Sequence, residues 1–261
     1  NRIKESSMSV VEEIREQQRK ALSTMSFKEK LAYFWDYYKV HTIVALFVVF
    51  TAGIFIKDMI SSKDTAFSAV VLNSYGFETQ EDFQADFSAY AGIDTNAYHC
   101  LIDATSTLSL ESMTQIDFAF SQRLAGMVQT NGLDAFVSDP LVFGHYAEEM
   151  LFRDLRKELS NEEYLKYEPY FYYIDAAAIE EKNKIDEAMA DVFSEISATQ
   201  TAPANPSAMT DPIPVGIYLD DSTKLAEWNC YANMEETPIF GFVETSNRTD
   251  ISHLFLQYLT D

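Results

Sequence analysis

The chain has few of the residues that usually carry catalysis or bind metals. It holds four scattered histidines and two cysteines, Cys100 and Cys230. The spacings typical of a nucleophile elbow, a zinc peptidase, a redox cysteine pair, a dinucleotide-binding turn or a phosphate-binding loop do not occur. Acidic pairs are frequent, but none has the spacing of an EF-hand calcium loop. We therefore expect no catalytic residues, no metal site and no cofactor, and a protein that is not an enzyme.

Basic residues are scarce in most of the chain. Residues 64–261 contain nine Lys/Arg against thirty-four Asp/Glu, a net charge of −25. Such a surface repels nucleic acid and anionic lipid headgroups, because both carry dense negative charge. It permits a partner with a basic surface.

The small number of cysteines leaves room for one disulfide at most. The environment outside a cell allows that bond to form. Pairing of Cys100 with Cys230 depends on the distance and orientation of the two side chains. The sequence does not fix either, so the paired and the free states both stay open.

One long apolar run is present, between Lys39 and Lys57, and His41 is its only ionisable residue. As a helix it has about the length needed to cross a hydrocarbon core of ~30 Å. A cleaved signal peptide is the alternative. The run is longer than the apolar part of such a peptide, and no Ala-x-Ala pattern follows it before Lys57. We expect a retained transmembrane helix at 39–60 and a single-pass protein of the cell membrane.

The charges that flank this run predict its orientation. Residues 1–39 contain eight Lys/Arg and six Asp/Glu, whereas the chain beyond the run is strongly acidic. Basic segments next to a membrane helix stay in the cytoplasm. We therefore expect a cytoplasmic N-terminus and an extracellular domain at 61–261. Aromatic residues before the run suit the membrane interface, where they are candidates for partner contact: Tyr33, Trp35 and Tyr37.

Residues 1–38 are expected to form a cytoplasmic helical arm with one interruption. Ser26 and Glu29 have the spacing of a capping box, which predicts a helix that starts there and runs into the membrane. The arm can be a solvated helix, can lie on the inner leaflet or can dock on a partner. Its net charge is small, so we favour docking on a partner over binding to lipid.

The part beyond the membrane alternates between strand and helix patterns. Short apolar runs predict strands at 66–73, 98–103, 133–139, 170–175, 213–219 and 238–243. Helical spacing of apolar residues predicts helices at 78–90, 111–129, 143–150, 162–167, 180–197, 222–228 and 250–259. Repeated β-α-β units are typical of a mostly parallel sheet with helices on both faces. We expect a single α/β domain.

Polar residues end several of these strands. Open α/β sheets bind ligands in a crevice at the carboxyl ends of their strands. The residues expected to line such a crevice are Asn73, Ser74, Asp103, Ser138 and Asp139. If the domain were a hydrolase instead, the two aspartates would be its candidate carboxylates. A second candidate is the aromatic run at 168–175: either helices cover both faces of this strand, or Tyr170 and Tyr172 belong to an exposed contact surface.

The order of elements resembles an extracellular solute-binding protein, a type 2 periplasmic-binding-protein-like domain. Three phrases carry the resemblance: Asn131 to Asp139; Phe143, Tyr146 and Ala147 with Leu151, Asp154 and Leu155; and Gly241 to Val243 with Ser246, Asn247 and the final helix. The resemblance covers residues 66–260 and implies the fold of one lobe. Only about seventy residues separate the strands at 133–139 and 213–219. A second lobe cannot be built from them, and one lobe cannot close around a ligand.

The resemblance and the membrane helix together imply an accessory role. We expect a membrane-anchored accessory subunit of a multi-pass membrane protein, such as a transporter or permease, that also contacts the lipid bilayer. The alternative is a membrane-anchored domain that captures or senses a small ligand.

Overall fold

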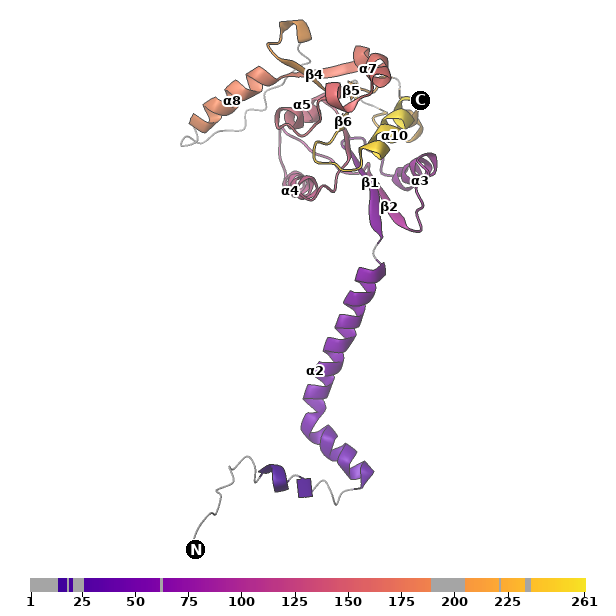
Figure 1. Ribbon diagram of the computed structural model, residues 1–261, viewed down its shortest axis with the longest axis vertical. Coiled ribbons are helices and arrows are strands. Elements are labelled where there is room, and N and C mark those ends of the chain that lie inside the picture. The colour runs from indigo at the N-terminus through magenta and orange to yellow at the C-terminus, as the bar shows by residue number, and fades with distance from the viewer. Residues whose placement is uncertain are drawn as a thin grey trace. The chain divides into compact units, whose positions relative to one another are not determined.

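The structure is a computed structural model that describes residues 14–17, 19–20, 26–61, 63–188, 205–220, 222–232 and 236–261. The chain divides into two compact units, residues 1–62 and 63–261 (Figure 1). The helix expected in the first part of the arm falls mostly outside the described residues.

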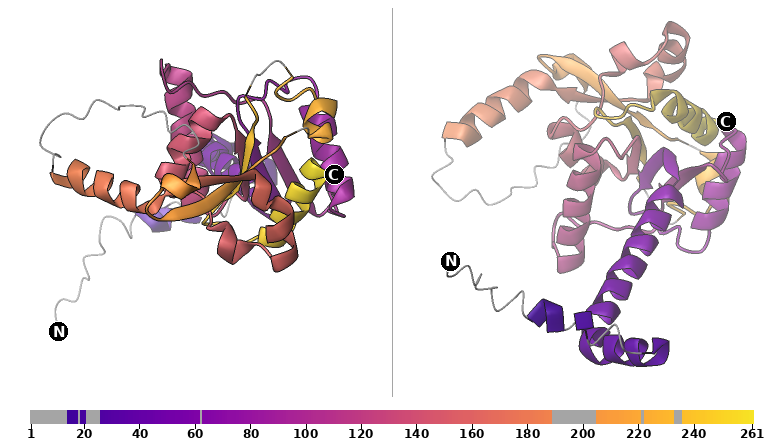
Figure 2. Two further views of the ribbon diagram at one scale, coloured as in Figure 1. Left: turned by 90° about the horizontal axis from the view of Figure 1, so that it is seen from above. Right: turned by 60° about the horizontal axis from the view of Figure 1, so that its bottom comes forward.

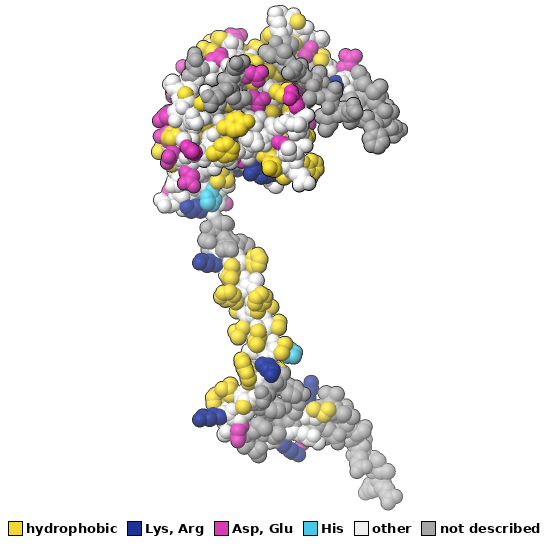
Figure 3. Space-filling view, turned by 180° about the vertical axis from the view of Figure 1, so that it is seen from behind, with side chains coloured by type: hydrophobic (Ala, Val, Ile, Leu, Met, Phe, Trp, Pro, Cys, Tyr) yellow, Lys and Arg dark blue, Asp and Glu magenta, His cyan; other side chains and the backbone are white. Residues whose placement is uncertain are grey.

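The first unit contains α2, a helix of 35 residues that runs from Phe27 to Ser61. It starts at the predicted capping box, in which the Ser26 amide donates to Glu29 Oε2 at 2.7 Å. The stretch from Tyr38 to Lys57 is long and apolar enough to cross a membrane, and none of its most apolar window is buried by the protein. Figure 3 shows the hydrophobic side chains around this helix. Within the described residues it is the one helix of this kind.

The second unit is built on a sheet of six strands in the order β2-β1-β3-β6-β5-β4. Their bounds are β1 Asp64–Val71, β2 Tyr98–Asp103, β3 Ala135–Ser138, β4 Phe171–Asp175, β5 Pro212–Tyr218 and β6 Ile239–Phe242. Every predicted strand is present, with ends shifted by one or two residues where they differ.

The sheet is mixed, which corrects the expectation of a mostly parallel one. β1 pairs in parallel with β2 and with β3, whereas β3–β6, β6–β5 and β5–β4 are antiparallel. Helices α3 and α4 make the parallel crossovers in the first half. In the second half the chain reaches the far edge at β4 and returns through β5 and β6, which reverses alternate strands.

Eight α-helices accompany the sheet within the described part of this unit. They are α3 Gln80–Tyr90, α4 Gln115–Gln129, α5 Pro140–Glu148, α6 Leu155–Glu158, α7 Asn161–Tyr167, α8 Ala176–Ala188, α9 Thr223–Glu227 and α10 Thr249–Thr260. Figure 1 shows α3 and α10 on one side of the sheet and α4 and α5 on the other. α8 extends away from the sheet (Figure 2). The rest of the helix predicted at 180–197 lies outside the described residues.

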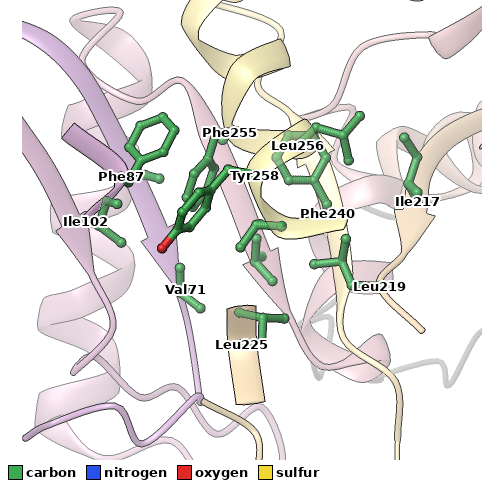
Figure 4. Packing of buried hydrophobic residues seen from close by; sticks show 14 of the residues in the cluster. Val71, Phe87, Ile102, Ile217, Leu219, Leu225, Phe240, Phe255, Leu256 and Tyr258 are labelled. Atoms are coloured by element: carbon green, nitrogen blue, oxygen red, sulfur yellow. The ribbon is translucent and has the colours of Figure 1, made fainter. Parts of the chain in front are cut away.

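The first hydrophobic core lies under α10 (Figure 4). Phe255 is fully buried, and its ring lies 5.1 Å from Phe67 of β1 and 4.8 Å from Phe87 of α3. Apolar residues at the spacing of a helix face place Phe255, Leu256 and Leu259 toward the sheet. Burial of these side chains fixes α10 across β1 and β6.

The second core lies on the opposite face, under α4 and α5. Phe143 stacks on Phe152 with ring centroids 4.2 Å apart. The sheet reaches these rings through two glycines: a Cβ on Gly216 would lie 2.6 Å from Phe143, and one on Gly241 would lie 2.6 Å from Phe152. Helices therefore cover both faces of the sheet, as predicted.

A buried carboxylate ties the second unit together near the start of β3. Asp134 is fully buried and accepts hydrogen bonds from the Ser68 amide at 2.8 Å, from Ser246 Oγ at 2.6 Å and from Arg248 Nε at 2.9 Å. These partners come from β1, from the segment after β6 and from the start of α10. The charge is paired and hydrogen-bonded, which is the condition under which a buried carboxylate is tolerated.

Candidate functional site

The residues expected to line a crevice do lie at the strand ends, and the structure connects several of them directly. Asn73 Nδ2 donates to Asp139 Oδ2 at 2.8 Å and to the Leu108 carbonyl at 3.0 Å. Asn73 Oδ1 accepts from the Leu108 amide at 2.8 Å. Asn73 has a positive φ of 58°, a conformation that asparagine adopts more readily than most residues. Both ends of its side-chain amide are thus used to hold the loop after β2.

Asp139 and Ser138 also form hydrogen bonds within the domain. Asp139 caps α5, with Oδ1 accepting from the amides of Leu141 and Val142 at 3.1 Å each. Ser138 is fully buried and donates to the Asp139 carbonyl at 3.1 Å. A carboxylate that accepts three hydrogen bonds from the protein is placed for capping rather than for abstracting a proton.

Tyr231 closes the ends of β1 and β3. Its hydroxyl donates to the Leu72 carbonyl, 2.6 Å away, and lies 3.2 Å from the Val137 carbonyl. Burial raises the pKa of Tyr231 well above its ordinary value. Next to it, Ser74 is buried, donates to the Ala104 carbonyl at 2.9 Å and accepts from the Tyr231 amide through its own carbonyl at 3.0 Å. Ser74 and Tyr231 thus hydrogen-bond to backbone carbonyls at this edge of the sheet.

Asp103 is partly exposed, with 24% of its side chain accessible. It pairs with Arg123 of α4 and accepts from Ser106 Oγ at 2.7 Å and from the Thr105 amide at 3.1 Å. Burial alone would raise the pKa of Asp103, but the hydrogen bonds from Ser106, Thr105 and Arg123 outweigh it and hold the pKa below its ordinary value. Asp103 is a stable anion that fixes the loop after β2.

The aromatic candidates fall in different environments. Trp35 is 55% exposed and Tyr170 is 44% exposed, so both side chains are accessible in their own units. Tyr172 is only 2% exposed, with its ring centroid 5.3 Å from that of Phe143. It therefore does not belong to an exposed contact surface, because helices cover both faces of β4. The side chains of Tyr33 and Tyr37 lie outside those that the structure describes.

Cys100 and Cys230 are both buried, and they are free thiols that form no disulfide with each other. Burial raises the pKa of Cys100, and it raises that of Cys230 to about 11. Thiols of this kind are protonated and unreactive at neutral pH.

His253 is held by two carboxylates. Its Nδ1 lies 2.9 Å from Glu163 Oε1 and its Nε2 lies 3.3 Å from Glu158 Oε1. Arg153 Nη1 also pairs with Glu158, at 2.8 Å. Across the described ranges no cluster of three or more His, Cys, Asp or Glu has an arrangement that could hold a metal ion. The contacts of His253 join α6, α7 and α10.

A cavity of about 690 Å³, here named the α4–α5 cavity, lies between these two helices. Its buried wall is apolar and includes Leu124 of α4, Tyr146 of α5 and Leu151. Its rim carries large apolar side chains that remain exposed: Met113 at 45%, Phe118 at 58% and Met150 at 52%. Large apolar groups gathered at one place on an acidic domain mark a candidate binding surface.

Polar groups are set into this apolar lining. Glu149 and Glu244 reach the cavity, and Glu149 Oε1 lies 3.5 Å from His145 Nε2. Thr245 also lines it, and its hydroxyl is buried without a hydrogen-bond partner. Among the described residues that line the cavity there is no lysine or arginine. Its character is thus apolar with acidic groups.

The sequence predicted a helix at 111–129 from the spacing of its apolar residues, and it did not indicate which of them would stay exposed. Phe120 and Leu124 do face the core, but Met113 and Ile116 are 45% and 74% exposed. The signal was present: Phe118 is two residues from both Ile116 and Phe120, so it cannot share a helix face with them.

Comparisons with protein-family models, with curated proteins and with solved structures found no match to this chain.

Proposed function

We propose that this chain is a single-pass, membrane-anchored accessory subunit of a multi-pass membrane complex such as a transporter. The observation that carries the proposal is the α4–α5 cavity with its exposed rim of Met113, Phe118 and Met150. Exposed apolar surface of this kind is typical of protein interaction sites. The strand-end residues support an accessory role over ligand capture, because their polar groups form hydrogen bonds within the domain.

The membrane anchor in this proposal is Tyr38–Lys57 of α2. Its apolar side chains are exposed all round, and a bilayer is the solvent that suits them. The basic excess in residues 1–39 supports a cytoplasmic N-terminus, and the acidic unit 63–261 is then extracellular. Trp35 is well suited to the inner interface and to contact with the partner. The likeness to one lobe of a solute-binding protein favours a transporter as that partner.

A second function, capture or sensing of a small ligand, is favoured by the volume of the cavity. Its value of about 690 Å³ lies within the usual range of ligand sites, and its apolar lining with a few polar groups is typical of them.

Purification of the tagged full-length chain from its native membranes in a mild detergent tests these functions. An accessory subunit brings with it a stoichiometric multi-pass protein that survives a salt wash and is identified by mass spectrometry. The control replaces residues 40–56 with a polyleucine helix, which keeps the anchor and removes its specific surface. Recovery of the unsubstituted chain alone and monomeric would contradict the accessory role, and a ligand screen on the full chain would then test capture.

A further inference from the structure

We propose that the α4–α5 cavity holds the apolar face of a cationic amphipathic helix that belongs to the partner. This inference rests on the proposed accessory function and specifies the site and the chemistry of the contact. It is built from three observations on this surface: its apolar rim, its course along α4 and its charge.

The rim of the cavity leaves large apolar side chains exposed on the surface of the second unit. Met113, Phe118 and Met150 are each about half exposed beside the buried Leu124 and Leu151. A second apolar surface that packs on these exposed side chains removes their apolar area from water, which is favourable. Methionine is flexible and polarisable, so two methionines at the edge can adapt to the side chains of an incoming helix.

The course of the cavity fits a helix rather than a strand. Its lining follows α4 from Phe118 to Gln129, which at ~1.5 Å per residue is a length of about three helical turns. A strand would add to a sheet edge, but the sheet here lies beneath the helices and its edges are β2 and β4. A helix that packs beside α4 meets it with apolar residues at the i, i+3, i+4 and i+7 positions.

The charge of the lining selects a cationic occupant. Glu149 is well exposed, with 58% of its side chain accessible, and Glu244 is also exposed. The described lining offers no lysine or arginine to neutralise them. The domain as a whole has a net charge of −25 over residues 64–261. Lysine or arginine beside an apolar stripe would pair with these carboxylates, and an acidic helix would be repelled.

Thr245 adds a polar contact to the site. Its hydroxyl is buried without a partner in a residue that lines the cavity. Most buried hydroxyls in native proteins have a partner, so this one calls for an explanation. Rotation about χ1 by about 120° moves the hydroxyl to another of the three staggered positions. An occupant with a polar side chain at this point would provide the missing hydrogen bond.

Photo-crosslinking in native membranes tests the proposal with the full-length chain. Phe118 is replaced by benzoylphenylalanine, and Leu165 of α7 is replaced in the same way as the matched control. Leu165 is 72% exposed and lies in a helix that packs on the other core. We expect Phe118 to crosslink the copurifying partner within a segment that combines a helical apolar stripe with Lys or Arg, and Leu165 to give none of this product.

A charge reversal gives a second readout. The double substitution Glu149→Lys and Glu244→Lys should lower the yield of the Phe118 crosslink at least about fivefold at low salt. Glu162→Lys in α7 should leave the yield unchanged. The wild-type yield should fall as salt is raised, because salt screens exposed charges.

Three results would overturn the proposal while the accessory function stands: a partner that copurifies but is not captured at Phe118, capture within a segment without basic residues, or a yield insensitive to the charge reversal. Capture of a second copy of this chain or of lipid would overturn it as well. If nothing copurifies with the unsubstituted chain, the accessory function fails first and the proposed helix contact fails with it.

Discussion

At the scale of single residues, the polar groups of this domain serve mainly to hold chain segments together. Asn73, Asp103 and Asp139 were expected to contact a ligand, and in the structure each also hydrogen-bonds to backbone groups of neighbouring segments. Loops around a sheet expose amides that need acceptors, and short polar side chains supply them.

Removal of the buried carboxylate of Asp134 should destabilise the second unit strongly. Asp134→Ala leaves the Arg248 guanidinium, the Ser68 amide and the Ser246 hydroxyl without their acceptor. Loss of one partner of a buried ion pair costs about 3–5 kcal/mol. Denaturant unfolding of the purified chain, followed by near-UV circular dichroism, measures the change. Glu162→Ala, at an exposed position of α7, should change the free energy of unfolding by less than about 0.5 kcal/mol. A similar loss for both variants would contradict the role of Asp134.

Asp103 should contribute to the loss of stability in acid. The folded-state pKa of its carboxyl lies below the ordinary value of 3.8, so the unfolded state binds the proton more readily. The stability that Asp103 contributes is present above pH 3.8 and is lost as the pH falls through the lower folded pKa. We therefore expect Asp103→Asn to be less stable than wild type at pH 7 and to lose less stability on going to pH 3.

Urea unfolding midpoints of both proteins at several pH values check this prediction. Asp250→Asn, which removes an exposed charge at the start of α10, controls for the change in net charge. Parallel curves for wild type and Asp103→Asn between pH 7 and pH 3 would contradict it.

At the scale of elements, the two glycines that let the sheet approach Phe143 and Phe152 make the sharpest test of packing. Gly216→Ala would place a methyl group 2.6 Å from Phe143 and 2.7 Å from Ile239. Overpacking of a core typically costs about 1–3 kcal/mol. Gly126→Ala in α4 is the matched control, because nothing lies within 4 Å of its added Cβ. It should stabilise the protein by about 0.5–1 kcal/mol, since alanine is a better helix former than glycine.

Thermal unfolding of the two variants should thus move in opposite directions. A higher melting temperature for Gly216→Ala, or a lower one for Gly126→Ala, would show that the packing around β5 or the helical state of α4 differs from the structure.

The elements were largely predictable from the sequence, and their pairing was not. The period of apolar residues located the strands and most of the helices, including the end of β2 at Asp103. The strands 171–175, 212–218 and 239–242 are apolar on both faces, so their residue pattern does not distinguish parallel from antiparallel pairing. Their antiparallel pairing depends on which edge of the sheet each connection reaches, and a single sequence does not determine the course of those connections.

The candidate site was predictable only in part for a related reason. Strand ends bring polar residues to one edge, and the sequence located them, but the hydrogen bond of Tyr231 to Leu72 at that edge comes from a loop far along the chain. The α4–α5 cavity depends on the space between two helices and on the side chains that line it. The spacing of residues along α4 shows that it has more apolar residues than one face can hold, but it does not show which element packs beside them.

At the scale of the whole molecule, the proposed orientation can be read from engineered cysteines. Cys100 and Cys230 are buried with raised pKa values, so the native thiols should give little background with a maleimide. Gln17 and Ser207 are exposed in their units. In intact cells a membrane-impermeant maleimide should label Ser207→Cys, and should label Gln17→Cys only after the membrane is permeabilised. The reverse pattern would place the acidic unit in the cytoplasm.

The position of α10 across β1 also bears on how such a domain is made. Phe67 begins the sheet and Phe255 covers it, yet nearly the whole domain separates the two rings along the chain. Until α10 has been synthesised, α3 alone packs on the first strands on that face. The pairing of β3 with β6 likewise waits for a strand made about a hundred residues later. A domain that cannot fold until its C-terminal part has been synthesised stays unfolded, and an unfolded chain can pass through a narrow channel. That property would suit the proposed extracellular placement, which requires the domain to cross the membrane before it folds.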